Sequence, residues 1–229
     1  VLHITDSGVI AKELKGQGEA VLAFLHGGNR DEDFSCCRYV CEDVDAVDEV
    51  YLDRVYRREK GLPLYILETE RCLIRETTLE DVDAFYEIYR EPEITEYMEP
   101  LYSEPEKEKA YARDYIEQVY AFYDFGIWTV TAKQSGEVIG RAGICYREGY
   151  EDPELGFVIA LPWQGKGLAT EVCRAVLDYA KEELGFGRVL AFVQPQNGAS
   201  VRVCRKIGMT QRENVVLQGT EYHIYVWEG

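Results

Sequence analysis

The 229-residue sequence contains no apolar run long enough to cross a lipid bilayer, which takes roughly 20 consecutive apolar residues. Residues 1–14 also lack the basic segment and the long apolar stretch of a secretory signal peptide. We therefore expect a cytoplasmic protein that has no membrane partner.

Positive charge is scarce in this chain. Lys and Arg together number 25 against 42 Asp and Glu, which gives a formal net charge of −17. Because the phosphates of a nucleic acid would be repelled by this surplus of carboxylates, we expect no nucleic-acid partner. The surplus favours cationic partners such as amines, polyamines, aminoglycosides or basic peptide ends, but acidity that only keeps a protein soluble explains it equally well.

Metal-binding patterns are missing as well. The three histidines are scattered, and the cluster of Cys36, Cys37 and Cys41 has no second Cys or His pair at the spacing of a zinc site. The seven cysteines are an odd number, and several lie within apolar patterns, as small buried side chains do. We expect reduced thiols and no metal ion.

The most informative pattern of strand, turn and helix lies in residues 154–184, with the sequence ELGFVIALPWQGKGLATEVCRAVLDYAKEEL. The apolar run Leu155–Ala160 predicts a short strand that is buried on both faces. Pro162 ends the strand, because proline has no amide hydrogen for the ladder. From Val172 to Leu184, apolar residues recur at helical spacing. Residues 164–170 are therefore a glycine-rich turn between a strand and a helix.

A turn of this kind is suited to bind an anion, because the first helical amides have no partners within the helix and the helix dipole adds positive charge. A P-loop is excluded, since Gly167 follows Lys166 where that loop needs Ser or Thr. A dinucleotide fingerprint is excluded, since Thr170 occupies the position of its third glycine. Gln164, Gly167 and Ala169 fit a third pattern, Gln/Arg-x-x-Gly-x-Gly/Ala.

This third pattern resembles the pyrophosphate loop of the GCN5-related N-acetyltransferases, the GNAT superfamily, which bind acetyl-coenzyme A. A second segment agrees with it: residues 197–200 and 206–209 resemble the N-x-x-S…K-x-G-F segment of that family. The start at Arg71 and the Gly-Ile-Trp strand at Gly126 resemble the RimJ/RimL-type branch, which acetylates the N-termini of ribosomal proteins. The resemblance covers about residues 70–229, with the motifs in the family's order.

The resemblance implies the GNAT acyl-CoA N-acyltransferase fold for residues 67–229. This is a mixed α/β sheet with helices on both faces and central strands that splay apart. Within this part the pattern predicts a helix over 106–123, hairpin strands over 127–132 and 138–146, and a closing hairpin about Gln218-Gly219.

Residues 1–66 predict a separate unit, a small Rossmann-like β-α-β segment. It faintly resembles the tail of haloacid-dehalogenase-type phosphatases, but the DxDx(T/V) nucleophile segment of that family is absent. We expect no hydrolytic role, and instead an accessory segment that packs on the transferase or mediates a homodimer.

The resemblance also implies which residues hold the coenzyme. They lie on the splayed strand, on the loop and at the starts of two helices: Phe157, Val158, Ile159, Gln164, Gly165, Lys166, Gly167, Leu168, Ala169, Thr170 and Asn197. Amides of the strand would hold the thioester oxygen as negative charge develops on it.

Two catalytic roles follow from the same resemblance. Glu154 matches a frequent glutamate of the family and would help an amine to lose its proton, although it could merely satisfy a strand end. Many members carry, at the position of Cys204, a Tyr that gives a proton to the departing thiolate. Ser200 is therefore the candidate acid here, and its alternative role is a local hydrogen bond. Candidate walls of the acceptor pocket, each also a candidate core residue, are Tyr97, Met98, Trp128 and Tyr146.

The predicted function is transfer of an acetyl group from acetyl-coenzyme A to a primary amine by direct attack on the thioester. The acceptor would be a small-molecule amine or a protein N-terminus. The alternative is a non-catalytic sensor or interaction module that binds coenzyme A, because the usual acid is missing at Cys204 and the first segment has no assigned role.

Overall fold

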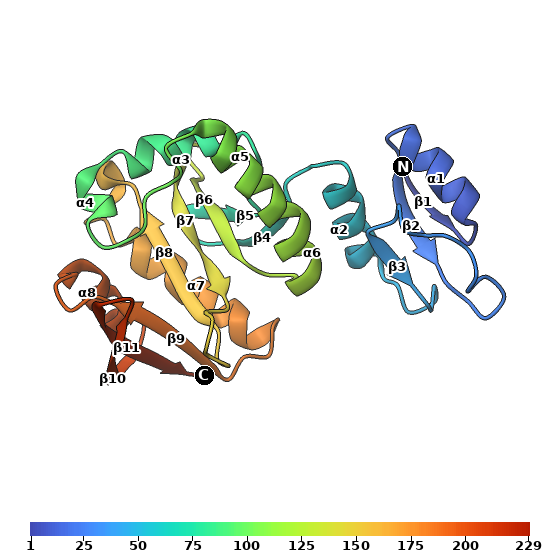
Figure 1. Cartoon of the computed structure of the whole chain (residues 1–229). Coiled ribbons are helices and arrows are strands. Elements are labelled where there is room, and N and C mark those ends of the chain that lie inside the picture. Colours follow the sequence, from blue (N-terminus) through green and yellow to red (C-terminus); the bar gives the residue numbers. More distant parts are fainter. The chain divides into compact units, whose positions relative to one another are not determined.

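The computed structural model describes all 229 residues and divides them into two compact units, Val1–Leu64 and Tyr65–Gly229 (Figure 1). The first unit ends at Leu64 rather than at residue 66, because Tyr65–Glu68 forms a strand of the larger sheet. No helix in the chain is both long and apolar enough to cross a membrane.

The first unit is a parallel three-stranded sheet in the order β1-β2-β3, with two helices. Its elements are β1 (Leu2–Thr5), α1 (Gly8–Gly16), β2 (Ala20–Phe24), β3 (Tyr39–Cys41) and α2 (Glu49–Glu59). The central strand has the apolar sequence AVLAF, and its side chains pack with Ala11 and Phe34 in the core of the unit. Burial on both faces explains why this strand lacks alternation of polar and apolar residues.

The second unit is an eight-stranded mixed sheet in the order β10-β11-β9-β8-β7-β6-β5-β4. Its strands are β4 (Tyr65–Glu68), β5 (Cys72–Arg75), β6 (Ile127–Ala132), β7 (Val138–Cys145), β8 (Glu154–Ile159), β9 (Arg188–Val193), β10 (Thr210–Leu217) and β11 (Thr220–Glu228). Neighbouring strands are antiparallel except β8 and β9, which are parallel. The mixed α/β architecture predicted from the sequence is confirmed.

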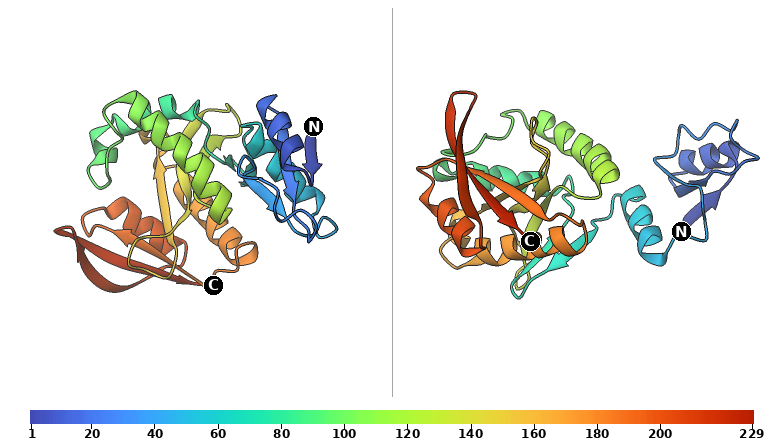
Figure 2. Two further views of the ribbon diagram at one scale, coloured as in Figure 1. Left: turned by 45° about the vertical axis from the view of Figure 1, so that its right-hand side comes forward. Right: turned by 90° about the horizontal axis from the view of Figure 1, so that it is seen from below.

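Helices lie on both faces of this sheet (Figure 2). They are α3 (Asp81–Tyr89), α4 (Pro92–Thr95), α5 (Pro105–Asp114), α6 (Tyr120–Tyr123), α7 (Leu168–Glu182) and α8 (Gly198–Lys206). The apolar stripe of α7, including Val172, Val176 and Ala180, is fully buried with Trp128 and Cys204 in the main core. This burial confirms the predicted helical spacing from Val172 to Ala180, whereas Leu184 lies beyond the end of the helix at Glu182.

The helix expected over residues 106–123 contains a π-helical turn, η1 (Tyr115–Val119), between α5 and α6. The wider turn directs Tyr115 and Tyr120 to the same strand residue. Tyr115 Oη accepts a hydrogen bond from the Ile127 amide at 2.8 Å, and Tyr120 Oη donates one to the Ile127 carbonyl at 2.7 Å. The turn therefore fixes the start of β6 under this helix.

The parallel strands β8 and β9 diverge almost at once. Glu154 and Leu190 form their only ladder pair, next to a hydrogen bond of 2.8 Å from the Leu190 amide to the Pro153 carbonyl. On its other edge β8 pairs with β7 from Glu154 to Ile159. The divergence leaves one edge of β8 without a partner strand, as the resemblance implied.

Candidate active site

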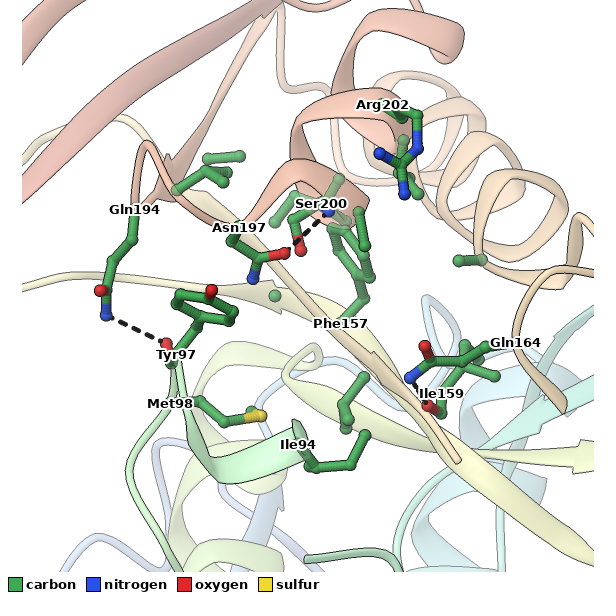
Figure 3. A pocket seen from close by; sticks show the side chains of 18 of the residues that line it. Ile94, Tyr97, Met98, Phe157, Ile159, Gln164, Gln194, Asn197, Ser200 and Arg202 are labelled. Atoms are coloured by element: carbon green, nitrogen blue, oxygen red, sulfur yellow. Dashed lines mark hydrogen bonds between the residues drawn. The ribbon is translucent and has the colours of Figure 1, made fainter. Parts of the chain in front are cut away.

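A cavity of about 730 Å³ opens where β8 and β9 diverge (Figure 3). Its walls come mainly from β8, from residues 163–165 and 167–170, from β9, α8 and the segment that joins them, and from α4 with the loop after it. These segments are distant in the sequence, so the cavity exists only in the folded chain. Unpaired backbone groups of β8 border it, and these groups can bind a ligand that continues the sheet edge.

The glycine-rich turn forms one end of the cavity. Gly165 and Gly167 have φ values of 72° and 83°, a left-handed conformation that favours glycine. Gly167 is the N-cap of α7 and supplies no side-chain cap, and the first helical hydrogen bond comes from the Glu171 amide to the Gly167 carbonyl at 3.1 Å. The amides of residues 168–170 therefore have no partner within the helix, and they lie at the cavity wall as a cradle for an anion.

Gln164 ties this turn to the end of β8. Its Nε2 donates a hydrogen bond of 2.8 Å to the Ile159 carbonyl, which holds the turn next to the strand. Lys166 is the one predicted loop residue that does not line the cavity, and its amine lies 5.0 Å from the centre of the Trp163 ring.

At the opposite wall, Asn197 caps α8 by accepting a hydrogen bond of 3.0 Å from the Ser200 amide to its Oδ1 (Figure 3). Both residues line the cavity. Cys204 does not, since it is fully buried, and burial raises the pKa of its thiol to about 12. Of the two residues weighed as the acid, only Ser200 is placed where a ligand can reach it.

Glu154 lines the cavity at the start of β8 and is only 9% exposed. Arg147 binds both of its carboxylate oxygens, with Nε 2.7 Å from Oε2 and Nη2 3.0 Å from Oε1. Hydrogen bonding to Glu154 raises the pKa of Arg147. This pairing compensates the charge of Glu154 and fixes the direction of its carboxylate.

The candidate acceptor walls divide into two groups. Tyr97 and Met98 line the cavity, and the Tyr97 carbonyl accepts a hydrogen bond of 3.4 Å from Gln194 Nε2. Trp128 is fully buried with its ring edge against Tyr179 of α7, because the alternation of β6 turns it to that face. Its expected place as a wall of the acceptor pocket is therefore corrected to a place in the core.

Tyr146 also lies outside the cavity wall. It packs against an aromatic cluster formed by Tyr123, Phe125 and Phe186, and it remains 44% exposed. This packing corrects the expectation that Tyr146 lines the acceptor pocket.

Sequence reasoning missed Arg147 and Gln194, which shape the same cavity. A signal for Arg147 was available, because a carboxylate at the start of a buried strand needs a counter-charge. Gln194 follows β9 directly and bonds backbone nearly a hundred residues earlier, at Tyr97, and no local pattern reveals such a contact.

The sequence model of the acetyltransferase (GNAT) domain matches residues 71–210, which include the diverging strands and the turn at Gly167. The chain belongs to the GNAT acetyltransferase family. It is therefore an N-acetyltransferase, and the GNAT fold predicted from the resemblance is confirmed.

Known proteins agree with this membership. The chain is 33% identical over 151 residues to the uncharacterized protein YkkB of Bacillus subtilis, covering 62% of this chain and 84% of that protein. It is 30% identical over 174 residues to the uncharacterized N-acetyltransferase YoaA of the same organism, and the match covers 71% of this chain and 94% of YoaA. A GNAT-family acetyltransferase structure from Bacillus anthracis superposes with a TM-score of 0.61 at 23% identity. The match covers 72% of this chain and 98% of that structure.

The GNAT family uses acetyl-coenzyme A as its acyl donor. RimL, a ribosomal L7/L12 α-N-protein acetyltransferase solved with coenzyme A, shares the fold with a TM-score of 0.60 at 13% identity, covering 72% of this chain and 97% of that one. The cavity here fits such a ligand, because helix amides without partners in the helix can bind an anion at one end and the open edge of β8 borders the same cavity. No group of three or more His, Cys, Asp or Glu is placed to hold a metal ion.

Proposed function

We propose that this GNAT protein transfers the acetyl group of acetyl-coenzyme A directly to a primary amine. The single observation that carries the proposal is the divergence of β8 from β9 beside the uncapped start of α7. The amides after Gly167 would bind the diphosphate, and the free edge of β8 at residues 157–159 would bind the pantetheine arm. An amide on that edge would stabilise the thioester oxygen as negative charge develops on it.

The amine must lose a proton before it attacks. With a pKa near 10, roughly one alkyl amine in a thousand is unprotonated at neutral pH. Glu154 is the carboxylate at the point where the strands divide, and we assign it the role of accepting that proton directly or through water. Its bond to Arg147 keeps the carboxylate aimed at one place.

We expect Glu154→Gln to lower kcat by about 100-fold, because the amide cannot accept the proton, while coenzyme A affinity changes little. The measurement is steady-state kinetics together with calorimetry of coenzyme A binding. Asp152→Asn is the matched control, since this nearby carboxylate pairs with Arg188 at 3.1 Å and does not line the cavity. Equal kcat values for wild type and Glu154→Gln would reject the role of Glu154 as base.

The leaving thiolate gains a proton, and we assign this step to the hydroxyl of Ser200, which passes its proton to the sulfur and regains one from solvent water. We expect Ser200→Ala to lower kcat by about tenfold or more. Cys204→Ala should leave kcat unchanged and lower thermal stability instead, because Cys204 is buried and does not line the cavity. A loss of kcat in Cys204→Ala alone, with Ser200→Ala unaffected, would reverse the assignment.

The acceptor side of the cavity favours a cationic amine. Glu93 and Glu99 line it together with Tyr97 and Met98. Three cations also line the cavity: Arg147 is already bound to Glu154, and Arg202 and Lys206 belong to α8. Fold relatives agree with an amine or peptide acceptor, since one is RimL and another is a spermidine N-acetyltransferase chimera with a TM-score of 0.57 at 18% identity.

The decisive experiment is an acceptor screen that follows free thiol released from acetyl-coenzyme A. Peptides with free N-termini, polyamines, aminoglycosides and small amino compounds form the panel. Thiol release that depends on one acceptor class supports the proposal and names that class. Tight binding of coenzyme A with no turnover across the panel would favour a non-catalytic coenzyme A sensor.

A further inference from the structure

The turn between β4 and β5 is joined to the cofactor loop by a dense set of contacts. Arg71 Nε lies 2.7 Å from Glu171 Oε2, and Arg71 Nη2 lies 2.6 Å from the same oxygen. The other oxygen of Glu171 accepts hydrogen bonds from Thr69 Oγ1 at 2.6 Å and from the Arg71 amide at 2.9 Å. Arg71 Nη1 also donates a hydrogen bond of 3.0 Å to the Lys166 carbonyl. One guanidinium thus binds both the loop and the first turn of α7.

The bond to Lys166 has a consequence for the loop amides. In a trans peptide, the carbonyl oxygen and the following N–H group point in opposite directions, and the chain has no cis peptide bond. With the Lys166 oxygen held by Arg71, the Gly167 amide points away from Arg71. Gly167 lines the cavity, whereas Arg71 and Lys166 do not. Arg71 therefore fixes the orientation of the Gly167 amide, in a residue that lines the cavity.

The bond to Glu171 has an electrostatic consequence. Glu171 lies in the first turn of α7, where a free carboxylate would repel a diphosphate bound at the same helix end. Burial alone would raise the pKa of Glu171, but hydrogen bonds from Thr69 and Arg71 outweigh burial and lower it. The carboxylate is therefore charged at neutral pH, and the guanidinium compensates that charge.

We propose that Arg71 is a positioning residue for coenzyme A, which aims the Gly167 amide and cancels the charge of Glu171 without touching the coenzyme itself. The inference rests on the proposed function, because it assumes that the loop binds the diphosphate. Arg71 lies in the turn between β4 and β5, about a hundred residues before the loop in the sequence. The proposal therefore gives a role in coenzyme binding to a residue outside the loop.

Calorimetry with coenzyme A tests the role of Arg71. We expect Arg71→Met to weaken affinity by about tenfold, and Arg71→Lys, which keeps the charge but not the planar fork, by about threefold. The double variant Arg71→Met/Glu171→Gln should bind more tightly than Arg71→Met, because the exposed repulsive charge is then gone. A purely structural role predicts no such recovery.

Two controls separate the possible causes. Pantetheine, which has no diphosphate, should bind wild type and Arg71→Met equally. Arg212→Met should change nothing, since Arg212 pairs with Glu228 at 3.2 Å away from the cavity. Equal coenzyme A affinity in wild type and Arg71→Met, or no recovery in the double variant, overturns the role of Arg71 alone. Failure of the wild-type protein to bind coenzyme A overturns the proposed function as well.

Discussion

Replacing Gly167 with Glu is expected to lower coenzyme A affinity by about 100-fold or more, which corresponds to roughly 2.8 kcal/mol. Gly167 has a φ of 83° and caps α7 without a side chain, so its amide and the next ones are open to the cavity. A glutamate there would place its Cβ 3.7 Å from Arg71 Nη2, where its charge competes with Glu171 for that guanidinium and adds negative charge at the helix end, and it would force a non-glycine residue into the left-handed region. Calorimetry with coenzyme A measures the loss.

Gly185→Glu separates the two causes. Gly185 follows the opposite end of α7, has a φ of 73°, has open space around its Cβ position and does not line the cavity. The substitution carries the same backbone strain and the same charge, so it should cost stability but leave coenzyme A affinity intact. Undiminished affinity in Gly167→Glu would refute the anion cradle and with it the proposed function.

Asp81→Asn is expected to destabilise the second unit by about 3 kcal/mol, the usual cost of breaking a buried ion pair. Asp81 is 4% exposed and begins α3. Both carboxylate oxygens lie 2.7 Å from the guanidinium of Arg75, and Oδ2 also accepts hydrogen bonds of 2.9 Å from the Thr78 amide and from Thr129 Oγ1. The asparagine would leave the guanidinium of Arg75 without a counter-charge. Its NH2 group is also a hydrogen-bond donor and would face an N–H donor where the carboxylate oxygen now accepts.

Tryptophan fluorescence during denaturant unfolding measures this effect, because all three tryptophans lie in residues 65–229. Asp83→Asn is the control two residues along the same helix. Its side chain is 81% exposed and lies 3.7 Å from Lys109 Nζ, so a change within about 0.5 kcal/mol is expected. Similar losses of unfolding free energy in the two variants would show that the buried Arg75–Asp81 pair contributes no more to stability than an exposed pair.

The pH dependence of stability gives an independent check on Asp81. Burial alone would raise the pKa of Asp81, but the hydrogen bonds from Arg75, Thr78 and Thr129 outweigh burial and lower it. A lowered pKa in the folded state means that the stabilisation is present above the unfolded value near 4 and is lost as pH falls through the folded pKa. The stability difference between wild type and Asp81→Asn should therefore shrink below about pH 4.

Some elements of the fold were readable because their signal is local. The apolar run Leu155–Ala160 and the helical spacing from Val172 onward lie within a few turns of chain, and both became the elements expected. The interruption of the helix over 106–123 was not readable. The π-helical turn at Tyr115–Val119 is matched to the backbone of Ile127, and that contact arises only after β6 has packed beneath the helix.

Aromatic residues show the same division at the site. Sequence reasoning treated Tyr97 and Trp128 alike, each as a candidate wall of the acceptor pocket and as a candidate core residue. The face alternation and register of β6 turn Trp128 toward α7, whereas the loop after α4 leaves Tyr97 at the cavity. Residue type alone carries no information about which face of the sheet a side chain occupies.

The amino-acid sequence by itself predicted the turn and helix start that we propose as an anion cradle, since glycines at 165 and 167 and an uncapped helix start are properties of one short segment. Tertiary structure decided how that turn is held and which groups lie beside it. Arg71 in the turn between β4 and β5 meets Glu171 of α7, and Arg147 meets Glu154 across a connecting loop. Pairings of this kind depend on strand order and register, because charged groups attract one another only over distances that the finished fold creates.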